Sequence, residues 1–181
     1  GTGIGCGIVA NGRIHRGAHG AAGDIGHIRL CGSQALCRCG NEGCLEAVAG
    51  GAALAAALRE LNIEAHNTRD VVDLVRAGDS RAARMVRNAG RALGEVLAGT
   101  INFFNPAVIV LGGDLAHAHE QVFAGAREVT YQRSTALATR HLEFARSVLD
   151  NDAGVIGGAV MAIEHVLSPE AIDQSLTSVT A

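Results

Sequence analysis

The order of elements along the chain predicts an α/β protein. Residues 107–111 form a continuous apolar run, as a strand buried on both faces requires. The turn Gly112-Gly113-Asp114 follows, and after it we expect a helix at about 117–130, a strand near 142–148 and a last helix to about Leu167. Strands that alternate with helices in this way are typical of layered α/β folds. A chain of 181 residues is long enough for one domain with a substantial core.

The N-terminal segment carries the signals of a β-hairpin. Residues 3–10 resemble a buried strand with small residues on one face, and Asn11-Gly12 is the strongest short-range signal for a tight turn. We therefore expect residues 13–16 to return as the paired strand. After a glycine-rich loop, a further short strand is expected near residues 27–30.

Two helices are predicted in the middle of the chain. Residues 45–61 are rich in alanine and leucine and predict a helix that breaks at its central Gly-Gly pair. Asn67 or Thr68 provides the cap for a second helix, which runs to about Arg76.

The longest helix is expected to start near Asp79-Ser80 and to end before Pro106. Apolar residues recur through it at spacings of three and four, which marks one buried face. Gly90 and Gly94 lie four residues apart within it and lower its intrinsic helix propensity. We therefore expect another element to pack closely against these two glycines.

Composition and charge exclude several classes of function. The net charge of −3 gives no electrostatic case for direct nucleic-acid binding by this segment. We expect no signal peptide, and no apolar run approaches the roughly 20 residues that span a bilayer, so no membrane partner is expected. Five clustered cysteines do not form a disulfide framework, which favours a reducing, cytoplasmic location.

A metal site is predicted where cysteines and glycines alternate. Cys37, Cys39 and Cys44 lie close together in the sequence, and His27 precedes them. Zinc prefers four such ligands at the corners of a tetrahedron, and four protein ligands make a site structural rather than catalytic. Cys31 is the rival to His27 as the fourth ligand. Cys6 lies in a strand pattern and is expected to be a small core residue.

Several motifs together resemble the ROK family of repressors, open reading frames and kinases. The cysteine motif spans Cys37 to Glu46, and Gly23-Asp24-Ile25-Gly26-His27 resembles the family's Glu-x-Gly-His motif. Gly1-Thr2-Gly3-Ile4-Gly5 resembles its second phosphate loop. Residues 105–114 resemble the strand and Gly-Gly turn of its nucleotide-binding lobe, and residues 152–159 resemble the start of its final helix.

This resemblance implies the C-terminal lobe of an actin-like ATPase (RNase-H-like) fold with a zinc-binding loop insertion. Residues 1–167 would form the lobe, with the zinc-binding loop at 27–44, and residues 168–181 a polar, frayed tail. The chain opens within a glycine-rich turn, so we expect it to be a piece of a larger protein. The N-terminal lobe and any helix-turn-helix domain are then expected outside this chain.

The resemblance also implies roles for individual residues. The zinc ligands would be His27, Cys37, Cys39 and Cys44. Sugar hydroxyls would be bound by Asp24, His27 and Glu46, which suits carboxylates because charge-assisted hydrogen bonds are strong. Nucleotide phosphates would be held by the glycine turns, at Gly1, Thr2, Gly3, Gly112 and Gly113.

One departure from the family pattern bears on function. The family's sugar-contacting glutamate is Asp24 here, and one methylene less withdraws the carboxylate by about 1.5 Å. A shorter side chain lengthens or loses a hydrogen bond that the kinases keep. Asp24 therefore favours a regulator over a kinase.

Three functions follow from the sequence. The favoured one is the sugar-effector-binding and oligomerising lobe of a ROK transcriptional regulator, which forms a homodimer or tetramer and reaches DNA only through an N-terminal domain. The alternative is the C-terminal lobe of an ATP-dependent, glucokinase-like sugar kinase, which would use ATP and Mg²⁺. The third is a zinc-stabilised oligomerisation module without a ligand. We expect no kinase activity from this chain alone, because the family's catalytic aspartate lies in the other lobe.

Overall fold

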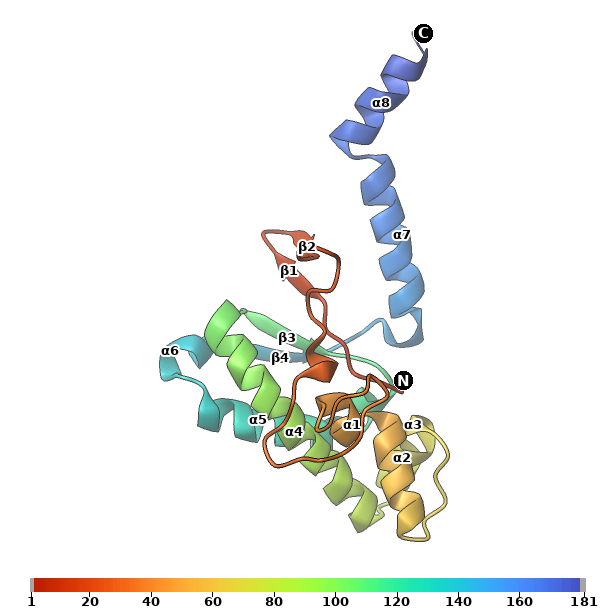
Figure 1. The fold of residues 1–181 in the computed structure, drawn as a ribbon, viewed down its shortest axis with the longest axis vertical. Coiled ribbons are helices and arrows are strands. Elements are labelled where there is room, and N and C mark those ends of the chain that lie inside the picture. Colours follow the sequence, from red (N-terminus) through yellow and green to blue (C-terminus); the bar gives the residue numbers. More distant parts are fainter. Residues whose placement is uncertain (1, 180–181) are drawn as a thin grey trace. The chain divides into compact units, whose positions relative to one another are not determined.

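The computed structural model describes residues 2–179 and divides the chain into two compact units, Gly1–Arg146 and Ser147–Ala181. None of the helices in the described range is long and apolar enough to cross a membrane. The first unit contains the elements that Figure 1 labels β1 to β4 and α1 to α6. Its bounds are β1 Ile8–Ala10, β2 Arg13–His15, α1 Leu45–Ala49, α2 Gly51–Glu60, α3 Thr68–Arg76, α4 Ser80–Phe104, β3 Val108–Leu111, α5 His119–Arg133, α6 Ala136–Thr139 and β4 Glu143–Arg146.

The hairpin prediction is confirmed. β1 and β2 pair antiparallel with Ala10 opposite Arg13, and the turn residues Asn11 and Gly12 have φ values of 52° and 73°. Positive φ at both turn positions is the geometry that Asn-Gly favours in hairpins. The prediction of a buried strand over 3–10 is wrong, because only its last three residues form β1 and most of the segment is exposed. Alternate glycines leave one face of this segment without side chains to pack.

Helices α1 to α5 enclose the core of the first unit. α1 and α2 are separated at Gly50, and Asn67 caps α3 through a capping box with Asp70, so both helix predictions are confirmed. In the capping box, the Asn67 side chain accepts from the Asp70 N–H while the Asp70 carboxylate accepts from the Asn67 N–H. These contacts satisfy amide groups that a helix start otherwise leaves unpaired.

The long helix α4 is confirmed with its predicted start and end. The Asp79 carboxylate accepts from the backbone N–H groups of the first turn, and Asn105 ends the helix in the left-handed conformation. α5 packs against α4 where the glycines lie, because a Cβ added at Gly90 or Gly94 would meet backbone carbonyl oxygens of α5. The predicted close approach is therefore confirmed.

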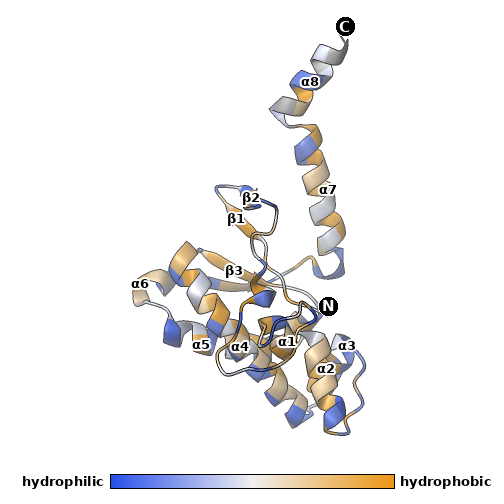
Figure 2. Ribbon diagram, viewed as in Figure 1, coloured by the Kyte–Doolittle hydropathy of each residue, from blue (hydrophilic) through white to orange (hydrophobic). Residues whose placement is uncertain are grey.

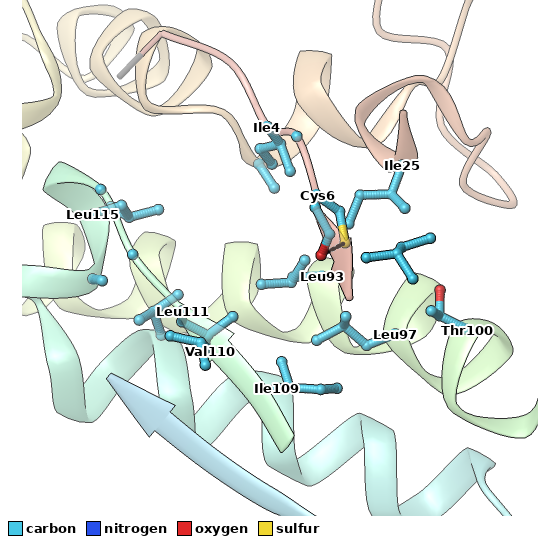
Figure 3. A pocket seen from close by; sticks show the side chains of 18 of the residues that line it. Ile4, Cys6, Ile25, Leu93, Leu97, Thr100, Ile109, Val110, Leu111 and Leu115 are labelled. Carbon is cyan, nitrogen blue, oxygen red and sulfur yellow. Dashed lines mark hydrogen bonds between the residues drawn. The ribbon is translucent and has the colours of Figure 1, made fainter. Parts of the chain in front are cut away.

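The predicted strands at 107–111 and 142–148 are present as β3 and β4. They pair in parallel, with Val108 opposite Glu143. The expectation that the first is buried on both faces is wrong, since Val110 is 59% exposed. In the described chain, β3 pairs with β4 along one edge and has no partner strand along the other. Residues of β3 also line an apolar cavity of about 670 Å³. Figure 3 shows this cavity between β3, α4 and the segment that carries Ile4 and Cys6.

The second unit is helical. A short 3₁₀ turn, η3 (Asp150–Asp152), leads into α7 (Ala153–Val166), as the sequence predicts. The expectation of a frayed tail is wrong, because α8 spans Pro169–Val179. Proline suits the first position of a helix, and the Ser168 hydroxyl accepts from the Ala171 N–H to satisfy the first turn. Figure 2 shows the apolar composition of α7, and every α7 side chain is exposed.

Candidate metal centre and neighbouring carboxylates

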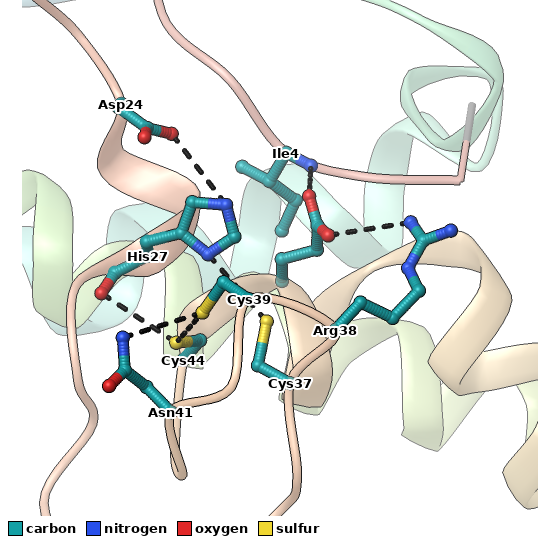
Figure 4. A network of polar contacts seen from close by, with 9 residues as sticks. Ile4, Asp24, His27, Cys37, Arg38, Cys39, Asn41 and Cys44 are labelled. Atoms are coloured by element: carbon teal, nitrogen blue, oxygen red, sulfur yellow. Dashed lines mark hydrogen bonds and ion pairs between the residues drawn. The ribbon is translucent and has the colours of Figure 1, made fainter. Parts of the chain in front are cut away.

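The residues predicted to bind zinc meet at one point in the first unit. The ligand atoms of His27, Cys37, Cys39 and Cys44 all lie within 4.8 Å of one another. The Cys37 Sγ is 3.6 Å from the His27 Nδ1, and the Cys39 Sγ is 3.7 Å from the Cys44 Sγ (Figure 4). Residues up to 17 positions apart in the sequence are therefore gathered into one donor set.

This donor set fits a tetrahedral zinc ion. Zinc–sulfur bonds of about 2.3 Å place two sulfurs of a tetrahedron about 3.8 Å apart, and zinc–nitrogen bonds are a little shorter. The Cys37–His27 and Cys39–Cys44 separations of 3.6 and 3.7 Å are close to those values, and all four ligand atoms lie within 4.8 Å of one another. Cys31 is exposed and lies outside the cluster, so the structure favours His27 over Cys31 as the fourth ligand.

Local backbone geometry builds the cluster without regular strands. Instead of the short strand expected near 27–30, Ile25–His27 form a 3₁₀ turn, η1, which places the His27 ring over the cysteines. The Cys37 N–H donates to the Asn41 carbonyl at 2.8 Å and closes a tight loop. Gly40 and Gly43 adopt φ values of 92° and 74°, which glycine alone adopts without strain.

The thiols of the cluster hold their protons unequally. The Asn41 backbone N–H, with further help from neighbouring side chains, lowers the pKa of Cys39 to about 7. Desolvation, followed by the neighbouring thiols Cys39 and Cys37, raises the pKa of Cys44 to about 12. A divalent cation in their midst would displace the remaining protons, because coordinating thiols bind metals as thiolates.

Asp24 lies beside the outer edge of the histidine ring. Its Oδ1 is 4.0 Å from the His27 Nε2, while the His27 Nδ1 faces the cysteines. The Asp24 side chain is 62% exposed. The structure therefore brings Asp24 and His27 together, with both polar groups accessible to a ligand.

Glu46 lies in the first turn of α1, two residues after the last cysteine of the cluster. Its Oε2 accepts from the Ile4 N–H at 3.1 Å, and its Oε1 is 3.6 Å from the Arg38 Nη2. The Glu46 side chain is largely buried, at 18% exposed. Arg38 and the Ile4 amide are contacts of Glu46 that were not predicted from the sequence. Arg38 has a signal in the sequence, since it is held between two predicted ligands.

The predicted phosphate-binding glycines gather around the apolar cavity. Gly3, Gly112 and Gly113 line it, whereas Gly1 lies outside the described residues. Thr2 instead lines a smaller hollow of about 360 Å³ together with Asp114. Further lining residues of this hollow that sequence reasoning missed are His66, Asn67 and Arg69.

Arg69 brings a positive charge to Asp114, the residue that follows the Gly-Gly turn. Its Nε lies 3.6 Å from the Asp114 Oδ1, in the hollow that Thr2 also lines. The two glycine-rich segments, which are more than 100 residues apart in the sequence, are thus brought to the same side of the first unit.

The α/β fold is that of ROK family structures, which have the actin-like ATPase sugar kinase fold. A family model described as the ROK family matches residues 1–165. The chain therefore belongs to the ROK family, as its motifs indicate.

The family contains both enzymes and regulators similar to this chain. A glucokinase of Thermotoga maritima is 34% identical over 92% of this chain and 57% of its own length. The DNA-binding transcriptional dual regulator NagC of Escherichia coli K12 is 32% identical over 91% of this chain and 42% of its own length. The chain thus spans about half the length of these curated relatives.

A solved structure supports the same assignment of fold. The ROK family glucokinase of Streptomyces griseus, determined in complex with glucose and AMPPNP, is 29% identical and superposes with a TM-score of 0.73. The match covers 89% of this chain and 57% of that one. Kinase and regulator relatives are similar to the chain to nearly equal degrees, so the family alone leaves both activities open.

Proposed function

We propose that this chain is the sugar-binding C-terminal lobe of a ROK transcriptional regulator, with residues 27–44 folded around a structural zinc ion. The observation that carries the proposal is the position of two carboxylates at the His27–cysteine cluster: Asp24 lies 4.0 Å from the His27 Nε2, and Glu46 lies in the helical turn that Cys44 caps. We assign the lobe to residues 1–167.

A bound zinc ion would hold the loop that carries the site in one conformation. The ligands would be His27, Cys37, Cys39 and Cys44, and a full set of four protein ligands leaves no position for a catalytic water. When bound, the ion supplies a fixed positive charge that holds the thiolates together. Because Cys44 is the N-cap of α1 and Glu46 lies in its first turn, a rigid loop would also hold the Glu46 carboxylate in place.

The sugar contacts follow from the polar groups that the cluster leaves accessible. The His27 Nε2 faces away from the cysteines, toward Asp24. Glu46 offers a carboxylate oxygen whose contact with the exposed Arg38 side chain, at 3.6 Å, is exchangeable. These groups can accept and donate hydrogen bonds to sugar hydroxyls, and hydrogen bonds to carboxylates are the stronger ones. The glucose named in the complex of the Streptomyces relative supports this ligand class.

Asp24 is the residue that favours a regulator over a kinase. Its exposed side chain is one methylene shorter than the family's glutamate, so we expect a weaker hold on a substrate than a glutamate would give. Effector binding tolerates this loss better than catalysis does, because catalysis needs the reacting hydroxyl fixed in place. In the whole protein, this lobe would form a homodimer or tetramer, and DNA would be bound by a separate N-terminal domain, as the similarity to NagC supports.

A kinase is the second candidate, and the glycine turns favour it. Gly3, Gly112 and Gly113 line one cavity, and Thr2 and Asp114 line another next to it. Exposed glycine amides at such turns bind phosphate groups. The AMPPNP named in the complex of the Streptomyces relative supports ATP and Mg²⁺ as ligands of the whole protein under this alternative.

Calorimetric titration of the full-length protein with a panel of neutral and phosphorylated sugars tests the common part of both candidates. We expect binding of one sugar class, loss of at least tenfold in affinity for Glu46→Ala, and no change for Glu60→Ala on the exposed end of α2. If no sugar binds, or if Glu46→Ala binds as well as the wild type, the proposal fails.

Two further assays separate the regulator from the kinase. Sugar-dependent release of the full-length protein from DNA, without turnover of ATP, supports the regulator. ATP-dependent phosphorylation of the bound sugar establishes the kinase and contradicts the regulator as proposed.

A further inference from the structure

The Glu46 carboxylate joins two parts of the site that the sequence keeps far apart. Its Oε2 accepts a hydrogen bond from the Ile4 N–H at 3.1 Å, across 42 residues. Ile4 lies within the Thr2–Gly5 loop, which carries two of the predicted phosphate-binding residues, Thr2 and Gly3. The Oε1 of the same carboxylate lies 3.6 Å from the Nη2 of Arg38, which comes from the cysteine loop.

Three glycines bring the backbone of the loop onto this carboxylate. A Cβ at Gly3 would collide with the Glu46 carboxylate itself. A Cβ at Gly26 would meet the Ile4 carbonyl oxygen, and one at Gly50 would meet the carbonyl oxygens of Glu46 and Thr2. The loop, the turn before His27 and the α1–α2 junction therefore pack together with no room for side chains, which leaves the loop little freedom to move independently of Glu46.

The two carboxylate oxygens have different partners. Oε2 accepts a hydrogen bond from a backbone amide of the same chain, the Ile4 N–H. Oε1 faces the Arg38 guanidinium at 3.6 Å, and that side chain is 78% exposed. An exposed ion pair of this length is weak and exchanges readily with solvent or with another donor.

We propose that Glu46 positions the Thr2–Gly5 loop through the Ile4 N–H, in addition to binding sugar, so that an occupied sugar site stiffens that loop. Sugar hydroxyls displace Arg38 from Oε1, while Oε2 stays on Ile4. Short, directional hydroxyl donors then fix the carboxylate better than the long arginine side chain does. Glu46 is thus a positioning residue for the loop as well as a ligand residue. This inference rests on the proposed sugar binding at Glu46.

Amide hydrogen exchange at Ile4 tests the link directly. The full-length, zinc-loaded protein is labelled with ¹⁵N-isoleucine, and exchange at Ile4 is followed by NMR with and without the sugar that calorimetry identifies. We expect the sugar to slow exchange at Ile4 about tenfold, as one strengthened charge-assisted hydrogen bond allows. Ile163, on exposed α7, is the internal reference and should not respond.

Variants separate positioning from simple structural support. Glu46→Gln keeps an acceptor but loses the charge, so exchange at Ile4 in the sugar-free protein should rise several-fold. In Arg38→Ala, the sugar-free loop should also exchange faster, and sugar should restore the slow exchange in full, because its hydroxyls replace the arginine. Glu60→Gln on α2 is the matched control and should change neither state.

The outcomes distinguish the inference from the proposed function. Sugar-dependent slowing in the wild type and in Arg38→Ala, together with faster sugar-free exchange in Glu46→Gln, supports the inference. Calorimetric sugar binding with an unchanged Ile4 exchange rate overturns it and leaves sugar binding standing. If calorimetry finds no sugar, the proposed function fails and the inference fails with it. Zinc content and circular dichroism establish that each variant is folded.

Discussion

The loop between His27 and Cys44 and the helical unit Ser147–Ala181 are organised in opposite ways. The loop has almost no regular secondary structure, yet Cys37, Cys44 and Leu30 are buried. The unit is almost wholly helical, yet every α7 side chain is exposed. Backbone hydrogen bonds alone form the helices of this unit, whereas the cysteine–histidine cluster and the glycine turns bury side chains within the loop. Regular secondary structure and burial of side chains therefore do not coincide in this chain.

The difference matters for stability. A single helix of 14 residues, such as α7, is marginal in water, because packing of an apolar face supplies most helical stability in proteins. The loop instead depends on contacts between residues far apart in the sequence and, under our proposal, on a metal ion. Metal removal or substitutions in and next to the loop should therefore lower stability much more than substitutions in α7 do.

Removal of the metal should have the largest effect. Structural zinc contributes on the order of 10 kcal/mol to the folding of small zinc domains. We expect chelation of the full-length protein to abolish amide protection over residues 27–46 while exchange over α7 stays the same. Cys31→Ser, which lies outside the cluster, should respond to chelation as the wild type does. Unchanged protection over residues 27–46, with the metal shown to be gone, would falsify the zinc proposal.

Core truncation next to the loop should have the second-largest effect. Leu45, at the start of α1, is 0% exposed, so Leu45→Ala should lower the free energy of unfolding by about 2–5 kcal/mol. The matched variant Ile163→Ala, at a position 57% exposed, should change it by no more than about 0.5 kcal/mol. Urea denaturation measures both. A cost at Ile163 equal to that at Leu45 would mean that α7 is buried in the protein in solution.

Helix caps should have a smaller effect. Asn67→Ala removes the capping box of α3 and should cost about 1 kcal/mol in the same urea measurement. At the start of α7, the Asp152 side chain makes no capping hydrogen bond in the described structure, so Asp152→Ala should cost a few tenths of a kcal/mol at most. Equal costs at the two positions would contradict this assignment of the caps.

Substitution of Asp70 should have the smallest effect, and its effect on stability should depend on pH. The His66 N–H, followed by the contacts from Asn67, lowers the pKa of the Asp70 carboxyl. A depressed pKa in the folded state contributes stability that is present above the unfolded value of about 4 and is lost as the pH falls through the folded value. Asp70→Asn should therefore be less stable than the wild type at pH 7 and approach it below about pH 4. Urea midpoints between pH 3 and pH 7 measure this, and parallel pH profiles would count against it.

The elements that the sequence predicted correctly carry local signals. Asn11-Gly12 sets its turn, Asn67 and Asp79 cap their helices, and Gly90 and Gly94 mark a close approach. The sequence also pointed to His27, Cys37, Cys39 and Cys44 as one cluster, and the structure brings them together, while their role as metal ligands stays a prediction.

The features that the sequence failed to predict depend on distant partners. Burial of β3 and of residues 3–10 requires neighbouring strands, and β3 and β1 each have a single partner strand in the described chain. The link from Glu46 to Ile4 joins residues 42 positions apart through a backbone amide, which has no signature in the sequence. The helix α8 replaces the expected frayed tail, since Ser168 and Pro169 start a helix as well as end one.

The most direct test of the account is the metal content of the native protein. We predict one equivalent of zinc per chain after purification under reducing conditions. Inductively coupled plasma mass spectrometry, together with the protein concentration, gives this ratio. Cys31→Ser should retain it, and Cys37→Ser should lose it. A folded, metal-free protein whose five cysteines all react as free thiols would contradict the account.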